Sequence, residues 1–293
     1  MQTRMTRPRR VAVAAHPSLP DALAEAEQVC DYFNQAGIET IKGESLHDAD
    51  LQRMAADGAL DALLALGGDG TMLRAGRLCA PLGVPVLGIN VGRFGFLAEV
   101  QRGEWQELLP RFLAGDFWLE ERMLLDVEHR RAQKTLGKWT ALNEAVVCRG
   151  RFVRPLTLHA FVDGYRLASY VADGLIAATP TGSTAYALAA GGPILPPELR
   201  NILIIPVAPH LSVDRAIILP QGAAVTIRAD TTYEAALSVD GQPPEGVLDG
   251  DEVSVTVADF TASFIRFQDP GYFYHNITRY MEQNPVTGIE NGR

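Results

Sequence analysis

The sequence contains very little lysine. Only Lys42, Lys134 and Lys138 occur in 293 residues, and none of them lies in a glycine-rich segment. The patterns GxxxxGK[ST] and GxGxxG are both absent. These absences exclude the P-loop and the usual dinucleotide-binding loop, whose glycines and lysine hold phosphates. A phosphate-handling site in this chain must therefore use backbone N–H groups, arginine side chains or a metal ion.

Cysteine and long apolar runs are scarce as well. Cys30, Cys79 and Cys148 lie far apart and form no CxxC pattern, which predicts reduced thiols in a cytoplasmic protein. No apolar run approaches the ~20 residues that a membrane-spanning helix needs. The apolar run VAVAA (11–15), which follows a basic start, is shorter than the ~7–15 residues of a signal sequence. We therefore expect no membrane partner and a cytoplasmic location.

Basic residues are outnumbered by acidic ones, and the formal net charge is -9 at pH 7. A protein that binds nucleic acid regardless of sequence needs a basic face, so we expect no nucleic-acid partner. Hydrophobic residues make up 47% and charged residues 21% of the chain, as is typical of a globular protein. The length allows one large domain or two ordinary ones.

Strand and helix patterns alternate over the first hundred residues. Apolar runs at 11–15, 59–66 and 83–90 predict buried strands, and the spacing of apolar residues at 21–36 and 71–80 predicts helices. This alternation is typical of βαβ units with a parallel sheet. We expect an α/β domain over residues 1–100. Its segments GGDGT and GINVGRFG lie at the carboxyl ends of strands, where such sheets bind ligands.

The pattern changes to short strands between about residues 117 and 266. Asp-Gly pairs at 163–164, 173–174, 240–241 and 249–250 are typical of turns between these strands. The pattern predicts a mostly β second domain over residues 101–266, with one helical insert near 183–190. We expect residues 267–293 to return to the first domain and complete it.

The segment GGDGT carries an acidic residue in a loop that otherwise suits phosphate. Gly67, Gly68 and Gly70 let the backbone approach a ligand closely, and the start of a helix favours an anion. Asp69 would repel that anion unless it faces the attacking hydroxyl, which a carboxylate orients and deprotonates in phosphoryl transfer. The alternative is a tight turn in which Asp-Gly serves only the backbone.

Polar residues cluster in three further segments. Hydroxyl side chains crowd TPTGST (179–184) before a short helix, which Thr181 or Ser183 could cap, and the alternative is an ordinary loop. Asn143 and Glu144 interrupt an apolar strand, which indicates a ligand contact or a surface pair. The segment SVDGQ (238–242) is also typical of a hairpin turn. A basic cluster at Arg149, Arg151 and Arg154 is either a solvated face or a partner for phosphates.

Taken together and in order, GGDGT, GINVGRFGFL, LNE, DGLIAATPTGSTAYALAAGGPI and DGQ resemble the NAD kinase family over roughly residues 60–245. The GGDGT loop alone is shared with diacylglycerol and sphingosine kinases and resembles that of phosphofructokinase, whereas TPTGSTAY is far more specific. The resemblance implies an N-terminal α/β domain with a parallel sheet, similar to phosphofructokinase and Rossmann folds, and an all-β C-terminal domain.

The resemblance also implies roles for individual residues. Asp69 is similar to the residue that takes the proton from the 2′-hydroxyl of the adenosine ribose of NAD. The implied loop for the phosphate donor comprises Gly67, Gly68, Gly70 and Thr71. The implied NAD contacts are Asp69, Gly70, Arg74, Asn143, Glu144, Arg154, Asp173, Thr184, Ala185, Tyr186, Ala187, Leu188, Ala189, Ala208 and Gln242. Ala189 stands where the family often has serine, and Val171 stands where some members carry a basic residue.

The reaction that the resemblance implies is transfer of the terminal phosphoryl group of ATP or polyphosphate to NAD, giving NADP. It implies a divalent cation, Mg²⁺ above all, and a homodimer or homotetramer, but no metal-ligand set follows from the residues. Two other functions stay open. The first is a lipid kinase of the diacylglycerol or sphingosine type, and the second is a dinucleotide-sensing module without turnover.

Overall fold

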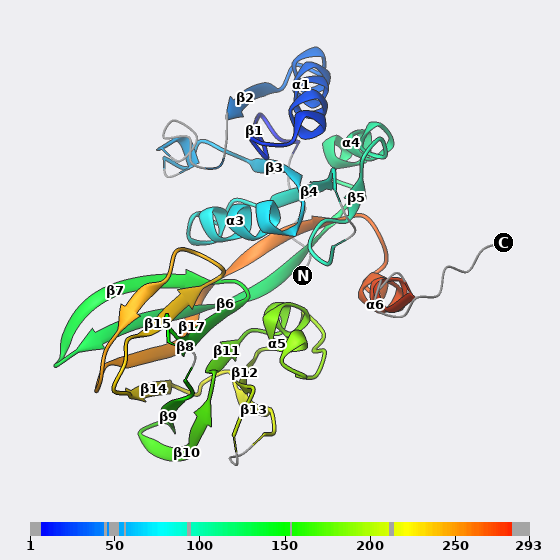
Figure 1. The fold of residues 1–293 in the computed structure, drawn as a ribbon. Helices are drawn as coiled ribbons and strands as arrows, with labels where there is room; N and C mark the ends of the chain where they lie inside the picture. Colours follow the sequence, from blue (N-terminus) through cyan, green and yellow to red (C-terminus); the bar gives the residue numbers. More distant parts are fainter. Residues whose placement is uncertain are drawn as a thin grey trace. The chain divides into compact units, whose positions relative to one another are not determined.

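The computed structural model describes residues 7–43, 46, 53–55, 57–92, 95–152, 154–210 and 214–282. The chain forms two compact units, one of residues 1–121 and 262–293 and the other of residues 122–261. Strands β6 (Trp118–Arg131) and β17 (Glu252–Arg266) each belong partly to both units (Figure 1). No helix among the described residues is long and apolar enough to cross a membrane.

The first unit is built on a parallel sheet, as the alternating pattern predicts. Its strand order is β2 (Glu39–Gly43), β1 (Arg10–Ala15), β3 (Ala62–Gly67), β4 (Val86–Asn90) and the end of β17, and β5 (Val100–Gln101) also pairs with β4. All these pairs are parallel. The central strands β3 and β4 are buried along their whole length, because a parallel sheet is covered on both faces.

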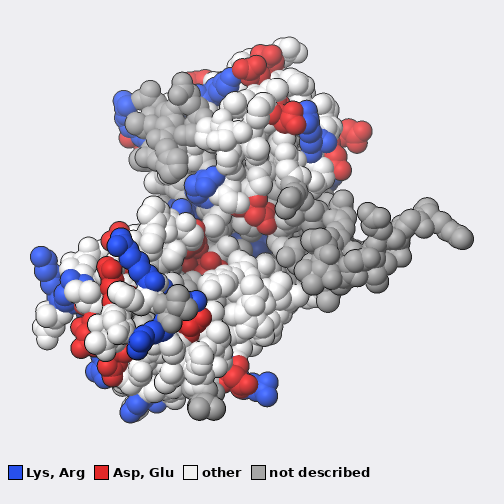
Figure 2. Space-filling model, viewed as in Figure 1, with Lys and Arg blue, Asp and Glu red and all other residues white. Residues whose placement is uncertain are grey.

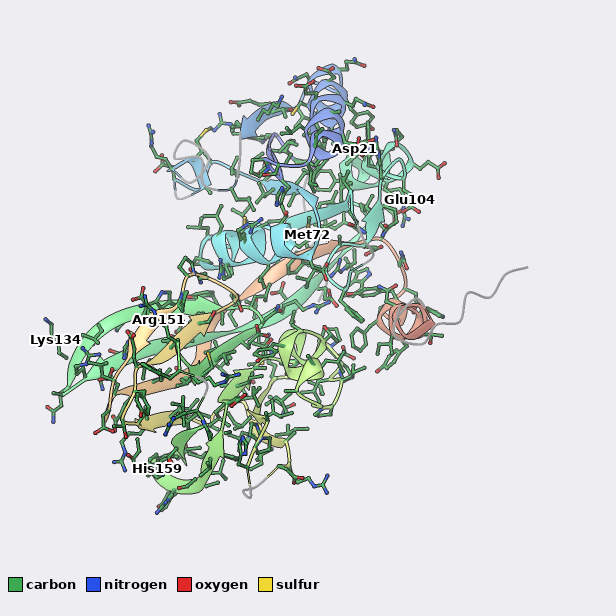
Figure 3. The ribbon with its side chains drawn as sticks, in the orientation of Figure 1. Asp21, Met72, Glu104, Lys134, Arg151 and His159 are labelled. Atoms are coloured by element: carbon green, nitrogen blue, oxygen red, sulfur yellow. The ribbon has the colours of Figure 1, made fainter. Side chains whose placement is uncertain are left out.

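Helices cover both faces of this sheet. They are α1 (Pro20–Gln35), α3 (Asp69–Cys79) and α4 (Trp105–Ala114), with a 3₁₀ turn at Ala80–Leu82. Helix α6 (Tyr272–Glu282) follows β17 in the same unit. Phe33 of α1 and Phe112 of α4 pack in one cluster with Val13 and Leu64 of the sheet. Met72 of α3 (Figure 3) lies so close to Gly88 of β4 that a Cβ atom at Gly88 would come within 2.6 Å of its sulfur. The small residue lets α3 lie directly on the sheet.

The second unit consists of two packed sheets. One is an antiparallel sheet in the order β13 (Ile217–Pro220), β12 (Asn201–Val207), β11 (Gly174–Ala178), β8 (Glu144–Arg149), β15 (Ala235–Val239) and β16 (Glu245–Val247). The other runs β10 (Tyr165–Ala172), β9 (Leu156–Val162), β14 (Val225–Asp230) and β17, with the hairpin of β6 and β7 (Lys134–Ala141) paired to β17. Lys134 lies at the hairpin tip (Figure 3).

The prediction of a strand-rich unit is confirmed, but one local prediction was wrong. Asp173-Gly174 is not a turn between paired strands, because β10 and β11 belong to different sheets and Asp173 lies at the bend between them. The helical insert predicted near residues 183–190 is present, as a 3₁₀ turn at Thr181–Thr184 and the four-residue α5 (Tyr186–Ala189). On the face drawn in Figure 2, Lys and Arg side chains lie among those of Asp and Glu.

Tyr170 of β10 is fully buried in the core between the sheets, and its hydroxyl has no hydrogen-bond partner among the described residues. A buried polar group without a partner costs about 1–3 kcal/mol. We expect Tyr170→Phe to raise the free energy of unfolding by about 1 kcal/mol in urea titrations. Tyr272→Phe is the matched control, because the Tyr272 hydroxyl donates to Glu120 at 2.8 Å and its loss should be destabilising. A less stable Tyr170→Phe protein would contradict this assignment.

Candidate active site

The GGDGT segment forms the junction between β3 and α3, as the sequence predicts. Gly67 ends β3, and a Cβ atom there would come within 2.9 Å of the Thr71 Cβ and nearer still to its hydroxyl, so only glycine fits. Gly68 precedes the helix with an extended backbone, and Gly70 is exposed with open space around it. The first N–H groups of a helix have no acceptor within the helix, so this junction can bind an anion. Arg74 lies half-buried one turn further on.

The Asp69 side chain turns away from its own helix and is held by another segment of the first unit. The N–H of Phe96 donates to Oδ2 at 2.8 Å, and the N–H of Leu97 donates to Oδ1 at 3.1 Å. Each carboxylate oxygen therefore accepts one backbone hydrogen bond, which fixes the plane of the group. Each oxygen keeps a further lone pair with which it can accept a proton.

Gly95 makes this arrangement possible. A Cβ atom at Gly95 would lie 2.5 Å from Oδ2 of Asp69 and closer to Oδ1, so any other residue would displace the carboxylate. GINVGRFG was predicted to lie near the site, but no role was predicted for Gly95, Phe96 or Leu97. A glycine directly before two apolar residues was the only local signal for a close backbone approach.

In the second unit, Asp240 of the SVDGQ turn binds three consecutive backbone N–H groups of the LNE segment. Its Oδ2 accepts from Leu142 at 2.8 Å, and its Oδ1 accepts from Asn143 at 2.9 Å and from Glu144 at 3.0 Å. Asp240 and Gly241 both have positive φ, as a turn requires. The predicted hairpin turn is therefore present between β15 and β16. Nothing in the sequence indicated that the Asp240 side chain binds the LNE segment.

The TPTGST segment is hydrogen-bonded to the same LNE segment. The Thr179 N–H donates to the carbonyl of Asn143 at 2.8 Å, and its hydroxyl donates to the carbonyl of Leu142 at 2.6 Å. A Cβ atom at Gly182 would overlap the Asn143 carbonyl, so the glycine permits the contact. Two motifs that are separated in the sequence thus form one polar framework in the second unit.

The predicted helix cap in this segment was wrong. The Ser183 hydroxyl donates to the Pro180 carbonyl at 2.6 Å and accepts the Leu195 N–H at 2.9 Å. The residue that precedes α5 is Ala185, and no side chain caps the helix. Because α5 has only four residues, we assign no anion site to its start.

Glu144 is the most perturbed acid of this framework. Its side chain is 8% exposed, and Oε2 has no partner among the described residues. Burial, reinforced by the negative charge of Asp240, raises the pKa of Glu144 to about 8, although the Tyr186 N–H acts in the opposite direction. Perturbed acids of this kind concentrate at functional sites.

We expect Glu144→Gln to make the protein more stable at alkaline pH. Because the pKa of Glu144 is raised from 4.5 to about 8 on folding, the folded state holds the proton more tightly. The stability from this group is complete below about pH 4.5 and is lost as the pH rises to about 8. Urea titrations at about pH 5 and about pH 8.5 measure the free energy of unfolding at each pH. Between these pH values it should fall by on the order of 3 kcal/mol more in the parent protein than in Glu144→Gln. Parallel curves for both proteins would contradict this, and exposed Glu252→Gln is the control.

The remaining predicted residues do not all lie at this framework, because Asp173 precedes β11 whereas Thr179 follows its other end. Tyr186 is 44% exposed, so its ring is available at the surface rather than in the core. Asp173 pairs with Arg149 at 3.1 Å, and Arg154 stacks over the ring of Tyr233. The other second-unit positions are Gln242 directly after the turn, Ala208 with a φ of 45°, Thr184 in the 3₁₀ turn, Ala185 between that turn and α5, and Ala187, Leu188 and Ala189 in α5.

Within the part of the chain that the structure describes, metal-binding side chains are not grouped. Among the described residues, no three His, Cys, Asp or Glu side chains are grouped so as to hold a metal ion. Mg²⁺ in phosphoryl transfer commonly binds one or two carboxylates together with the substrate phosphates rather than a cage of protein ligands. We therefore assign no protein ligand set to a cation.

Family models match most of the chain. The model of the ATP-NAD kinase N-terminal domain matches residues 11–117, and that of the ATP-NAD kinase C-terminal domain matches residues 142–267. Curated relatives agree with this. The NAD kinase of Chloroflexus aurantiacus is 36% identical over 275 residues, which are 94% of this chain and 99% of the relative. That of Moorella thermoacetica is 46% identical over 217 residues, covering 73% and 69% of the two chains.

Solved structures share the fold. Yeast NADH kinase complexed with NADH superposes with a TM-score of 0.84 at 23% identity, covering 97% of this chain and 90% of its own. An NAD kinase from Archaeoglobus fulgidus in complex with ATP has a TM-score of 0.73 at 24% identity, covering 93% and 98%. The α/β unit with a parallel sheet and the β-rich unit are thus the architecture of these kinases.

Proposed function

The chain belongs to the NAD kinase family and is an NAD kinase, and we propose that Asp69 is the base of its reaction. In this proposal the 2′-hydroxyl of the adenosine ribose of NAD attacks the terminal phosphorus of the donor. The bond from that phosphorus to its leaving oxygen breaks, and NADP forms. The hydroxyl proton passes to the carboxylate of Asp69.

The observation that carries the proposal is the way in which Asp69 is held. The N–H groups of Phe96 and Leu97 bind one oxygen each, at 2.8 and 3.1 Å, so the carboxylate cannot rotate freely. A base fixed before the substrate arrives loses little entropy in the transition state. Phosphoryl transfer needs little covalent assistance, so such positioning supplies much of the catalysis.

We propose that the framework of the second unit binds the dinucleotide. Asn143 and Glu144 would hold hydroxyl and base groups, and the exposed ring of Tyr186 would stack on the adenine. Support comes from Asp240, which fixes the backbone of both residues at 2.9 and 3.0 Å. The contacts proposed for Arg154, Asp173, Ala208 and Gln242 rest on the family resemblance.

We propose that the start of α3 binds the phosphate donor. Gly67, Gly68, Gly70 and Thr71 form the junction, and its helical N–H groups suit the terminal phosphates. A divalent cation, with Mg²⁺ as our choice, would neutralise phosphate charge. We assign no step to it.

The test of this function is NADP formation by the purified protein from NAD and Mg²⁺, with ATP and inorganic polyphosphate as parallel donors. We expect NADP with ATP. NAD binding without NADP from either donor would instead support the sensing module. Phosphorylation of diacylglycerol or sphingosine in a parallel assay would support a lipid kinase, which the matches to both NAD kinase domains disfavour.

Two broader proposals complete this assignment. A cytoplasmic location rests on Cys30, Cys79 and Cys148, all of which are unpaired. A homodimer or homotetramer rests on the family resemblance, and light scattering of the purified protein would distinguish the two.

A further inference from the structure

A buried arginine lies at the end of β17, behind the segment that holds Asp69. Arg266 is fully buried, and burying an unpaired guanidinium group would be very unfavourable. Its Nε and Nη2 donate to Oε2 of Glu120 at 2.9 and 2.7 Å, and its Nη1 donates to the carbonyl of Leu97 at 2.8 Å. All three nitrogens are therefore engaged, and one of them contacts the same residue whose N–H binds Asp69.

The guanidinium group is itself held rigidly. Its carbon lies 5.0 Å from the ring centre of Tyr272 and 5.4 Å from that of Phe264. The Tyr272 hydroxyl donates to both oxygens of Glu120, at 2.8 and 2.9 Å, so the partner of Arg266 is fixed as well. The direction of the Nη1–H bond to Leu97 is thus set by packing rather than by the loop it reaches.

A second contact ties the same two chain segments together. Oε1 of Glu99 accepts the N–H groups of Phe267 and Gln268 at 2.9 and 2.7 Å. Each segment therefore contributes one side chain to the contact. Arg266 binds the carbonyl of Leu97, and Glu99 binds the backbone N–H groups that follow Arg266. The loop that holds Asp69 is anchored by a strand more than 160 positions away in the sequence, since the Arg266–Leu97 separation is 169 residues.

We infer that Arg266 is a positioning residue for catalysis, which holds the Leu97 peptide and through it the carboxylate of Asp69. This inference rests on the proposed role of Asp69 as the base. The path is short and consists of two hydrogen bonds, from Arg266 to the Leu97 carbonyl and from the Leu97 N–H to Asp69. The alternative is a buried ion pair that only stabilises the first unit.

The test is Arg266→Lys, because a lysine ammonium cannot reproduce the planar set of donors. We expect kcat to fall about 10–10²-fold, since a small misplacement of a catalytic group has effects of that size. KM for NAD and ATP should stay within about three-fold, because the substrate contacts are untouched. Hydrogen exchange of the Phe96 and Leu97 amides should become faster in the folded protein.

Arg131→Lys is the matched control. It makes the same chemical change in a guanidinium group of the second unit that binds both oxygens of Asp251, at 2.8 Å each, and does not contact the segment that holds Asp69. We expect a lower Tm with kcat within about two-fold of the parent. An unchanged kcat in Arg266→Lys would overturn the inference. So would an equal loss of kcat in both variants at equal loss of Tm.

Combining the variants separates this inference from the proposed function. If Arg266 acts through Asp69, Arg266→Lys should change the residual rate of Asp69→Asn by less than about three-fold, because the two effects are not additive. Full turnover in Asp69→Asn alone would refute the base assignment itself.

A second variant tests the inference where Arg266→Lys does not fold. Glu120→Gln weakens the charge-assisted hydrogen bonds to Arg266, and we expect kcat to fall by roughly 3–10-fold. An unchanged kcat there would also overturn the inference.

Discussion

Asp69→Asn is expected to lower kcat for NADP formation by about 10²–10⁴-fold, the usual effect of removing a general base. Asparagine has the shape of aspartate but cannot accept a proton at neutral pH. It also places an NH₂ group against one of the two N–H donors of Phe96 and Leu97, which leaves a donor without an acceptor. NAD affinity should change little, because the base acts on the transition state more than on binding.

The matched control for this variant is Asp61→Asn. Asp61 lies just before β3, whereas Asp69 follows its end, and Asp61 also binds two neighbouring backbone N–H groups, those of Arg9 and Arg10, at 2.7 and 2.9 Å. The same chemical change there should leave kcat within about two-fold. Steady-state kinetics, Tm and NAD binding by calorimetry should be measured for both. If Asp69→Asn keeps most of its turnover, Asp69 is not the base.

Gly95→Ala is expected to lower kcat by about 10²-fold while the protein remains folded. The new methyl group would come within 2.5 Å of Oδ2 of Asp69. The group in its way is the end of a side chain rather than backbone, so the carboxylate can swing aside without unfolding the unit. It would then lose the hydrogen bonds from Phe96 and Leu97 that orient it.

The control lies in the same loop. A Cβ atom at Gly92 would meet only Oδ1 of Asn90, at 3.9 Å, which is ordinary van der Waals contact. Gly92→Ala should therefore keep kcat within about two-fold and change Tm little. Equal kinetics for the two alanine variants would show that the position of the Asp69 carboxylate does not limit the reaction.

The sequence by itself determined the fold class and the family. Alternating apolar runs and helical spacing in the first hundred residues report burial and backbone preference, which are local properties that tertiary contacts rarely reverse over whole βαβ units. The glycines of GGDGT also placed Asp69 at a strand-to-helix junction, because a glycine-rich segment between an apolar strand pattern and a helical pattern is visible in residue type alone. The clustered hydroxyl groups of TPTGST and the polar pair of LNE within an apolar strand are also visible in residue type alone.

Only the tertiary structure decided how these groups are held. Ser183 resembles a helix cap in the sequence, yet its hydroxyl binds the Leu195 N–H instead, because the chain returns there after a loop. Asp240 binds Leu142 across 98 positions, and Arg266 reaches Leu97 across 169. Periodicity extends over a few residues, whereas a hydrogen-bond partner depends on which distant segment the fold brings within about 3 Å. For that reason the sequence pointed to Asp69 as a candidate base, and only the fold shows which backbone N–H groups hold its carboxylate.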